Sequence, residues 1–160
     1  INQLLAGVHI AAASEAIAFA AKQGLDIRKV YEVITASAGN SWMFENRVPH
    51  ILAGDYRPLS AIEIFVKDLG IVQDMVRAER FPAPIAAAAL QMYLASAGLG
   101  FGRDDDSSVA RTYAQLSGAR LPQPGGPAER RAPSSQRLRC ARIDGSIRAG
   151  GDHAPAVPTP

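Results

Sequence analysis

The chain contains few of the residue types on which disulfide frameworks, metal centres and strand-rich folds depend. Its 160 residues include one cysteine, Cys140, which excludes an internal disulfide and a cysteine-based zinc site. Three histidines, His9, His50 and His153, are widely spaced and form no paired-His motif, so no metal is expected. No segment alternates apolar and polar residues as strands do. With so little cysteine, the cytoplasm is the default compartment.

Charge is low and unevenly divided. Residues 1–121 carry 11 basic and 12 acidic residues, whereas residues 122–160 carry 6 basic and 3 acidic residues. The basic pI therefore belongs to the tail and is only a weak indication of a nucleic-acid partner. No aromatic residue follows Tyr113, so the tail lacks the stacking platforms of single-strand binders. We expect no nucleic-acid partner.

The longest apolar stretch, residues 4–21, is interrupted by His9, Ser14 and Glu15 and consists mostly of alanine. We interpret it as a core helix buried between others, with His9 as a hydrogen-bonded core residue, and expect no membrane partner. No basic segment of a signal peptide precedes it. The chain opens at Ile1 within this helical pattern, without a capping residue, so we expect it to be a piece of a longer protein.

Apolar residues at three- and four-residue spacing predict an all-α, multi-helix bundle over residues 1–121. Asp26 and Gly24 suit a helix start and a helix end. The segment 42–51 fits either a short helix or an irregular stretch. The other expected helices are 2–22, 27–37, 61–80, 84–99 and 107–116.

Composition changes at Pro122. Residues 122–160 contain seven prolines and five glycines and few bulky apolar residues, so we expect a disordered tail. Two interpretations of it stay open, a native tail and coding sequence read out of frame.

Two glycine- or aspartate-rich segments could be mistaken for binding motifs. The glycines of 98–102 lack the strand–turn–helix context of a dinucleotide fingerprint, and we interpret them as a hinge. The three aspartates of 104–106 we interpret as the solvated start of a helix, where negative charge suits the helix dipole.

Lys67 and Asp68 are adjacent charges inside an apolar helical pattern. Either would be costly to bury alone. Consecutive helical residues point about 100° apart, so the two are not expected to face each other. Both could lie on the solvated face, or Lys67 could reach a ligand, and spacing alone does not decide between these. Asn2-Gln3 at the start carries little meaning by itself.

Several motifs, in order, resemble the C-terminal domain of the β-hydroxyacid dehydrogenase family, to which 6-phosphogluconate dehydrogenase is more distantly related. They are the start Ile1-Asn2-Gln3-Leu4-Leu5 with Glu15-Ala16, the motif Phe65-Val66-Lys67-Asp68-Leu69-Gly70, and Pro82-Ala83-Pro84 followed by an Ala-rich helix, a Gly-rich turn and Asp-Asp-Ser. The segments 39–47 and 60–65 look most like its L-threonate dehydrogenase branch. The resemblance covers residues 1–121.

The resemblance implies an NAD-dependent oxidoreductase, with NADP also open, acting on a small hydroxy acid, with L-threonate as the expected substrate. Asn2 matches the substrate-binding Asn, Lys67 the lysine near the nicotinamide, and Asp68 its motif partner. Ser60 stands where many relatives have Phe, which implies a smaller, polar substrate wall.

The family's catalytic lysine would fall two residues before Ile1, and the Rossmann domain also upstream, so the chain contains no catalytic residue of its own. We expect a fragment that is inactive alone and that forms homo-oligomers through its helices. The alternative is a non-catalytic oligomerisation or interaction module.

Overall fold

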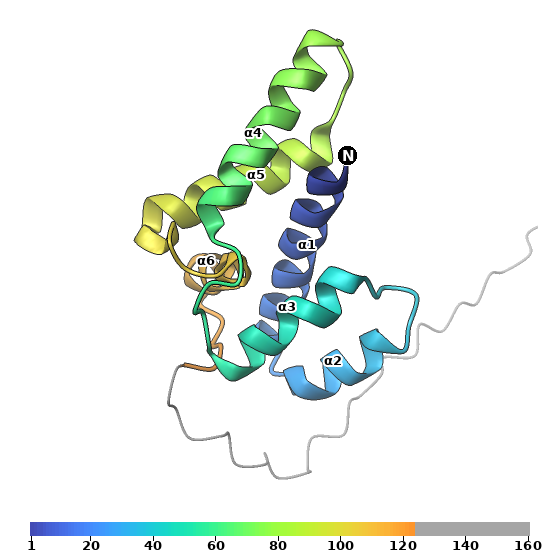
Figure 1. The fold of residues 1–160 in the computed structure, drawn as a ribbon. Helices are drawn as coiled ribbons and strands as arrows, with labels where there is room; N and C mark the ends of the chain where they lie inside the picture. The colour runs from blue at the N-terminus through green and yellow to red at the C-terminus, as the bar shows by residue number, and fades with distance from the viewer. Residues whose placement is uncertain (124–160) are drawn as a thin grey trace, which may run out of the picture. The chain divides into compact units, whose positions relative to one another are not determined.

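The computed structural model describes residues 1–123, and within them the fold is all-α, as the sequence predicts (Figure 1). The predicted helices form, with ends within a few residues of expectation. A π-helical turn η1, Ala97–Phe101, and a 3-10 turn η2, Asp106–Ser108, connect the last two helices. The six α-helices are α1 Asn2–Lys22, α2 Ile27–Thr35, α3 Trp42–Ala53, α4 Ile62–Ala78, α5 Pro84–Ser96 and α6 Val109–Ser117. Most of the expected tail, with Cys140 and His153, lies outside the described residues.

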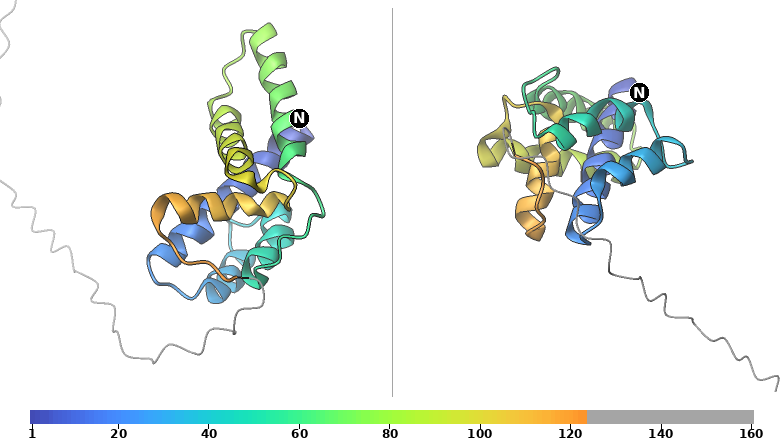
Figure 2. Two further views of the ribbon diagram at one scale, coloured as in Figure 1. Left: turned by 90° about the vertical axis from the view of Figure 1, so that its left-hand side faces the viewer. Right: turned by 90° about the horizontal axis from the view of Figure 1, so that it is seen from below.

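Helix α1 is shared by two hydrophobic clusters and packs against each of the other five α-helices (Figures 1 and 2). Its C-terminal half, with Ile17 fully buried, joins the cluster that includes α2 and α3. Its N-terminal half, with Ile10 fully buried, joins the cluster that includes α4 and α5. Because α1 contributes to both clusters, it is the central helix that joins the two parts of the hydrophobic core.

The expectation that α1 is buried between other helices holds for one part of its surface and not for the rest. Leu5 and Phe19 are 49% and 64% exposed, and His9 is exposed rather than a hydrogen-bonded core residue. Alanine satisfies either environment, so an Ala-rich sequence does not reveal which face is covered. Both α1 and the segment Pro84–Phe101 are long and apolar enough to cross a bilayer, yet half of the apolar window of α1 is buried inside the fold. That burial fits the core-helix interpretation.

Helix α3 forms as a regular α-helix and contains Pro49 in its interior. Proline has no N–H, so the carbonyl of Glu45, four residues earlier, loses its helical donor. The hydroxyl of Tyr31 on α2 donates to this carbonyl at 3.2 Å. The Tyr31 ring also stacks on Phe44 of α3. The contact between α2 and α3 therefore replaces the hydrogen bond that Pro49 removes.

Helices α1 and α4 approach closely at Gly7. A Cβ atom there would lie 2.9 Å from Cδ1 of Phe65 and 3.0 Å from Leu69, both on α4. The hydroxyl of Tyr93 on α5 donates to the Gly7 carbonyl at 2.9 Å, and its ring stacks on Phe65. Glycine therefore brings the start of α1 against the middle of α4.

The interpretation of 104–106 as a solvated helix start is wrong for two of the three aspartates, because Asp105 and Asp106 are fully buried. Asp106 pairs with Arg47 of α3 at 2.7 Å. Asp105 accepts from the backbone N–H groups of Leu59 and Ser107 at 3.0 and 3.1 Å. The Asp106 carboxylate thus joins the segment before α6 to α3, and the Asp105 carboxylate joins the same segment to the loop before α4.

Opposing effects act on the buried carboxyl of Asp106. Burial raises its pKa to about 6, and the partner guanidinium of Arg47 only partly offsets this rise.

The glycines of 98–102 form a sharp turn at the end of α5. Gly100 has φ +90°, a conformation that favours glycine. The turn interrupts the predicted helix 84–99 after Ser96 and leads to η2. Whether the turn acts as a hinge stays a prediction.

Candidate functional site

The first turn of α1 and the middle of α4 bring four polar side chains together, here called the polar cluster: Asn2, Gln3, Lys67 and Asp68. Asn2 Nδ2 donates to Gln3 Oε1 at 2.8 Å, and Gln3 Nε2 donates to Asp68 Oδ2 at 2.7 Å. Lys67 Nζ lies 3.1 Å from Asp68 Oδ1. Figure 2 shows the N-terminus beside α4. The chain of contacts thus links Asn2 to Lys67 across 65 positions of sequence.

Burial divides the two adjacent charges on α4. The Asp68 side chain is 15% exposed and turns toward α1, whereas the Lys67 side chain is 67% exposed. The Gln3 amide, and to a smaller degree Lys67, lower the pKa of Asp68. The interpretation that both charges lie on the solvated face is therefore wrong for Asp68.

The expectation that Lys67 and Asp68 do not face each other is also wrong. It treated the two Cα–Cβ directions alone, and the four-carbon lysine stem is long enough to bring Nζ back to its neighbour. The Lys67 ammonium, exposed at the surface and held on one side by Asp68, remains accessible to a ligand.

Ser60 lies apart from the polar cluster. It precedes Ala61, the N-cap of α4. Asp68 lies seven positions after Ala61, which is about 10 Å of helix rise. The Ser60 carbonyl accepts from the N–H of Asp106 at 2.7 Å. The buried Asp106 therefore holds the backbone of this loop, and Ser60 itself is half-buried. The structure brings Asn2, Lys67 and Asp68 together. Ser60 lies apart from them, just before the start of α4.

Gln3 is the member of the polar cluster to which sequence reasoning assigned no role. It alone contacts both Asn2 and Asp68. A local signal existed, because Gln3 and Leu4 start the apolar face of α1 and a polar side chain there needs a partner. The identity of that partner depends on tertiary packing through Gly7.

The polar cluster presents one exposed ammonium, that of Lys67, and one exposed amide, that of Asn2, to the solvent. The ammonium can contact an anionic or polar group of a ligand. No glycine-rich strand–turn–helix unit occurs in residues 1–123, so these residues supply no cradle for the pyrophosphate. No group of three or more potential metal ligands occurs in that part of the chain.

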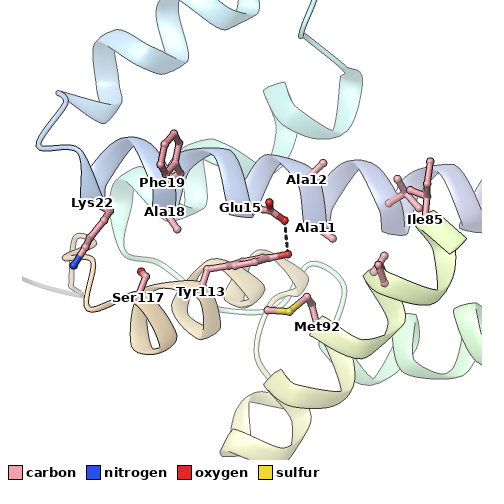
Figure 3. A pocket seen from close by; sticks show the side chains of 13 residues that line it. Ala11, Ala12, Glu15, Ala18, Phe19, Lys22, Ile85, Met92, Tyr113 and Ser117 are labelled. Atoms are coloured by element: carbon pink, nitrogen blue, oxygen red, sulfur yellow. Dashed lines mark hydrogen bonds between the residues drawn. The ribbon is translucent and has the colours of Figure 1, made fainter.

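A second candidate site is an apolar groove between α1, α5 and α6, with a volume of about 550 Å³ (Figure 3). Tyr113 donates to Glu15 at 2.9 Å across it. Burial and the Glu15 carboxylate raise the pKa of Tyr113. Phe19 and Ile85, which line the groove, are 64% and 68% exposed. Such a surface suits a protein contact better than a small polar substrate.

Comparison with known proteins identifies the class. The family model described as "NAD-binding of NADP-dependent 3-hydroxyisobutyrate dehydrogenase" matches residues 1–113. The chain therefore belongs to the 3-hydroxyisobutyrate dehydrogenase family of nicotinamide-dependent oxidoreductases.

Three individual proteins of this family are similar to the chain over most of its length. The L-threonate dehydrogenase of Cupriavidus necator is 61% identical over 113 residues, which cover 71% of this chain and 38% of the relative. The L-threonate dehydrogenase of Escherichia coli K12 is 52% identical over 122 residues, covering 76% and 39%. The crystal structure of a 3-hydroxyisobutyrate dehydrogenase from Salmonella typhimurium superposes with a TM-score of 0.69 at 56% identity, covering 69% and 39%. The chain thus spans about two fifths of the length of these relatives.

Proposed function

We propose that this chain is the helical C-terminal part of an NAD(P)-dependent hydroxyacid dehydrogenase whose substrate is L-threonate. The observation that carries the proposal is the polar cluster, in which an exposed lysine and an exposed amide are held together at the junction of α1 and α4. The names of the relatives, L-threonate dehydrogenases at 61% and 52% identity, support the choice of substrate.

When bound, a nicotinamide cofactor would supply the acceptor for a hydride from the hydroxyl-bearing carbon of the substrate. By the resemblance, Asn2 would bind the substrate, Lys67 would hold the cofactor, and Asp68 would hold the Lys67 ammonium in place. Ser60 lines the substrate side with a small polar group. A general base must lie within hydrogen-bond reach of the proton that it removes. By the family motif this base is a lysine two residues before Ile1, so we expect residues 1–160 alone to be inactive.

The cofactor-binding residues that distinguish NAD from NADP belong to a Rossmann domain. We propose NAD, with NADP as the alternative to be tested. A cytoplasmic location accords with a soluble dehydrogenase of small acids.

A protein expressed from the whole reading frame that contains this chain tests the proposal. It should oxidise L-threonate with NAD or NADP. Lys67→Met should raise the cofactor KM at least about tenfold, the effect of losing about 1.4 kcal/mol of charge-assisted binding. Lys29→Met, an exposed lysine change on α2, is the matched control and should leave the KM unchanged. Equal KM values in the two variants would remove Lys67 from the cofactor site.

Ser60→Phe tests the proposed substrate wall in the same protein. The ring should lower kcat/KM for L-threonate more than for 3-hydroxyisobutyrate, because a larger apolar wall excludes the additional hydroxyl groups. Equal effects on both acids would contradict a role for Ser60 in selecting the substrate.

The groove favours a second property, self-association through the helical domain. Phe19 and Ile85 expose apolar area that a second copy of the chain would cover. Light scattering on the chain should give a dimer or larger assembly, and Phe19→Ser should shift it toward the monomer. An oligomer without L-threonate oxidation by the whole protein would favour the alternative of a non-catalytic oligomerisation or interaction module.

A further inference from the structure

The polar cluster is a chain of hydrogen bonds whose direction is set at one end. Asp68 Oδ2 accepts from Gln3 Nε2, and Asp68 Oδ1 faces the Lys67 ammonium. An ionised carboxylate has no proton to donate and can only accept. Gln3 must therefore turn its amide nitrogen, and not its amide oxygen, toward Asp68.

The orientation of Gln3 then determines that of Asn2. With Nε2 on Asp68, Gln3 Oε1 faces Asn2 and accepts from Nδ2 at 2.8 Å. Because an amide oxygen cannot donate, Asn2 must offer its nitrogen to Gln3, and its Oδ1 turns away from the polar cluster. Among residues 1–123, none donates a hydrogen bond to Asn2 Oδ1, and Asn2 is exposed.

We propose that Gln3 and Asp68 are positioning residues, which fix the Asn2 amide so that its Oδ1 accepts a hydrogen bond from a hydroxyl group of the ligand. An amide oxygen repels a carboxylate, so the ligand group at Oδ1 is a hydrogen-bond donor. In the proposed hydroxy acid the donors are the hydroxyl groups, and the acid group lies elsewhere. The identity of the ligand rests on the proposed function, whereas the orientation of Asn2 does not.

Asp68 acts in this arrangement as an anchor. Gln3 and Lys67 occupy its two oxygens, and both contacts favour the ionised form. Protonation would allow Asp68 to donate, and the direction of the whole chain of hydrogen bonds would no longer be fixed. The positioning should therefore be complete above the depressed pKa of Asp68 and be lost as the pH falls through it.

The orientation can be measured in the 15N-labelled 160-residue chain through the side-chain amide resonances of Asn2 and Gln3. Both should shift with one common midpoint below 3.8, the ordinary pKa of an aspartate. At neutral pH the Asn2 amide protons should exchange with solvent more slowly than in Asp68→Asn, by up to about fivefold, the factor for complete loss of one net hydrogen bond. Asp74→Asn, a change at an exposed aspartate on α4, is the control and should alter neither result.

A second substitution distinguishes positioning from a general loss of structure. Adding Gln3→Glu to Asp68→Asn reverses the donor and the acceptor between positions 3 and 68. The new carboxylate at position 3 can still only accept, so Asn2 must again donate to it, and the slow exchange should return. Independent midpoints for Asn2 and Gln3, or unchanged exchange in Asp68→Asn, would overturn the positioning role, as would failure of the double variant to restore slow exchange.

The ligand class is tested separately with L-threonate and butyrate, which share a carboxylate but differ in hydroxyl groups. L-threonate should shift the Asn2 amide resonance and butyrate should not. Equal responses to both, or no response to either, would overturn the hydroxyl contact at Oδ1. If Asn2 and Gln3 still share one midpoint and the double variant still restores slow exchange, such ligand results would count against the proposed substrate only. The positioning of Asn2 by Gln3 and Asp68 would not be affected.

Discussion

Substituting alanine for Gly7 should destabilise the fold even though alanine is the better helix former. In an isolated helix the change gains up to about 1 kcal/mol. Here the new Cβ would lie 2.9 Å from Cδ1 of Phe65, whose ring is 2% exposed and stacked on Tyr93. Overpacking of this kind costs roughly 1–3 kcal/mol, and displacing the Tyr93 hydroxyl from the Gly7 carbonyl costs about 1 more. The expected net loss in the free energy of unfolding is about 2 kcal/mol.

Gly70 provides a matched control. It also lies inside a helix, α4, but a Cβ there would meet no atom within 4 Å. Gly70→Ala should therefore raise the free energy of unfolding by about 0.5–1 kcal/mol. Urea unfolding followed by circular dichroism measures the free energy of unfolding of both variants. In thermal unfolding, each kcal/mol should move the Tm by about 4 °C for a domain of this size.

The opposite signs are the decisive feature of this pair. Stabilisation by both substitutions would mean that α1 and α4 do not approach at Gly7. The polar cluster would then lose the packing that holds Gln3 against Asp68, and the account of the site would fail with it.

Three further perturbations test separate parts of the fold. Burial raises the pKa of Asp106 to about 6, against 3.8 for an ordinary aspartate, so the unfolded chain ionises first as the pH rises. The free energy of unfolding should therefore fall by about 2 kcal/mol between pH 4 and pH 7. Asp106→Asn should flatten this slope, and an unchanged slope in urea titrations would refute the reasoning. Gly54→Ala should lower the free energy of unfolding more than Gly24→Ala does. Both glycines have positive φ, but only Gly54 packs against the backbone of residues 122 and 123. Equal losses of stability in thermal unfolding would contradict that packing. Tyr31→Phe should lower the free energy of unfolding by about 1 kcal/mol in the native chain. It should have almost no effect once Pro49→Ala restores the missing helical N–H. An additive double-mutant cycle would show that the Tyr31 hydroxyl does not replace that N–H.

The sequence predicted the helices well because their signals are local. Asp26 accepts from the N–H groups of Arg28 and Lys29 at the start of α2, and Gly24 and Gly118 adopt the left-handed conformation after α1 and α6. Apolar spacing and capping operate within a few residues, so one sequence is enough to detect them.

Burial of charge could not be predicted in the same way. Asp105 and Asp106 resembled a favourable helix start, but their partners Arg47 and His50 lie more than 50 positions away in sequence. The open face of α1 was missed for a related reason, since alanine is compatible with both core and surface. Such features follow from the arrangement of the helices and not from their periodicity.

The candidate site lies between these cases. Asn2, Lys67 and Asp68 were found through motif resemblance, and the structure places them in one hydrogen-bonded chain. Gln3 was noted beside Asn2 but received no role, because its role depends on a partner on another helix. Ser60 was named with them, but its loop is held by Asp106 and lies about 10 Å along α4 from Asp68.

The central claim is that this chain is the helical part of a hydroxyacid dehydrogenase, and the coding sequence immediately upstream of the Ile1 codon tests it most directly. The account predicts an open reading frame that encodes a glycine-rich βαβ unit and ends with a lysine two residues before Ile1. A stop codon or unrelated sequence there would contradict the proposed enzyme and favour a non-catalytic helical module.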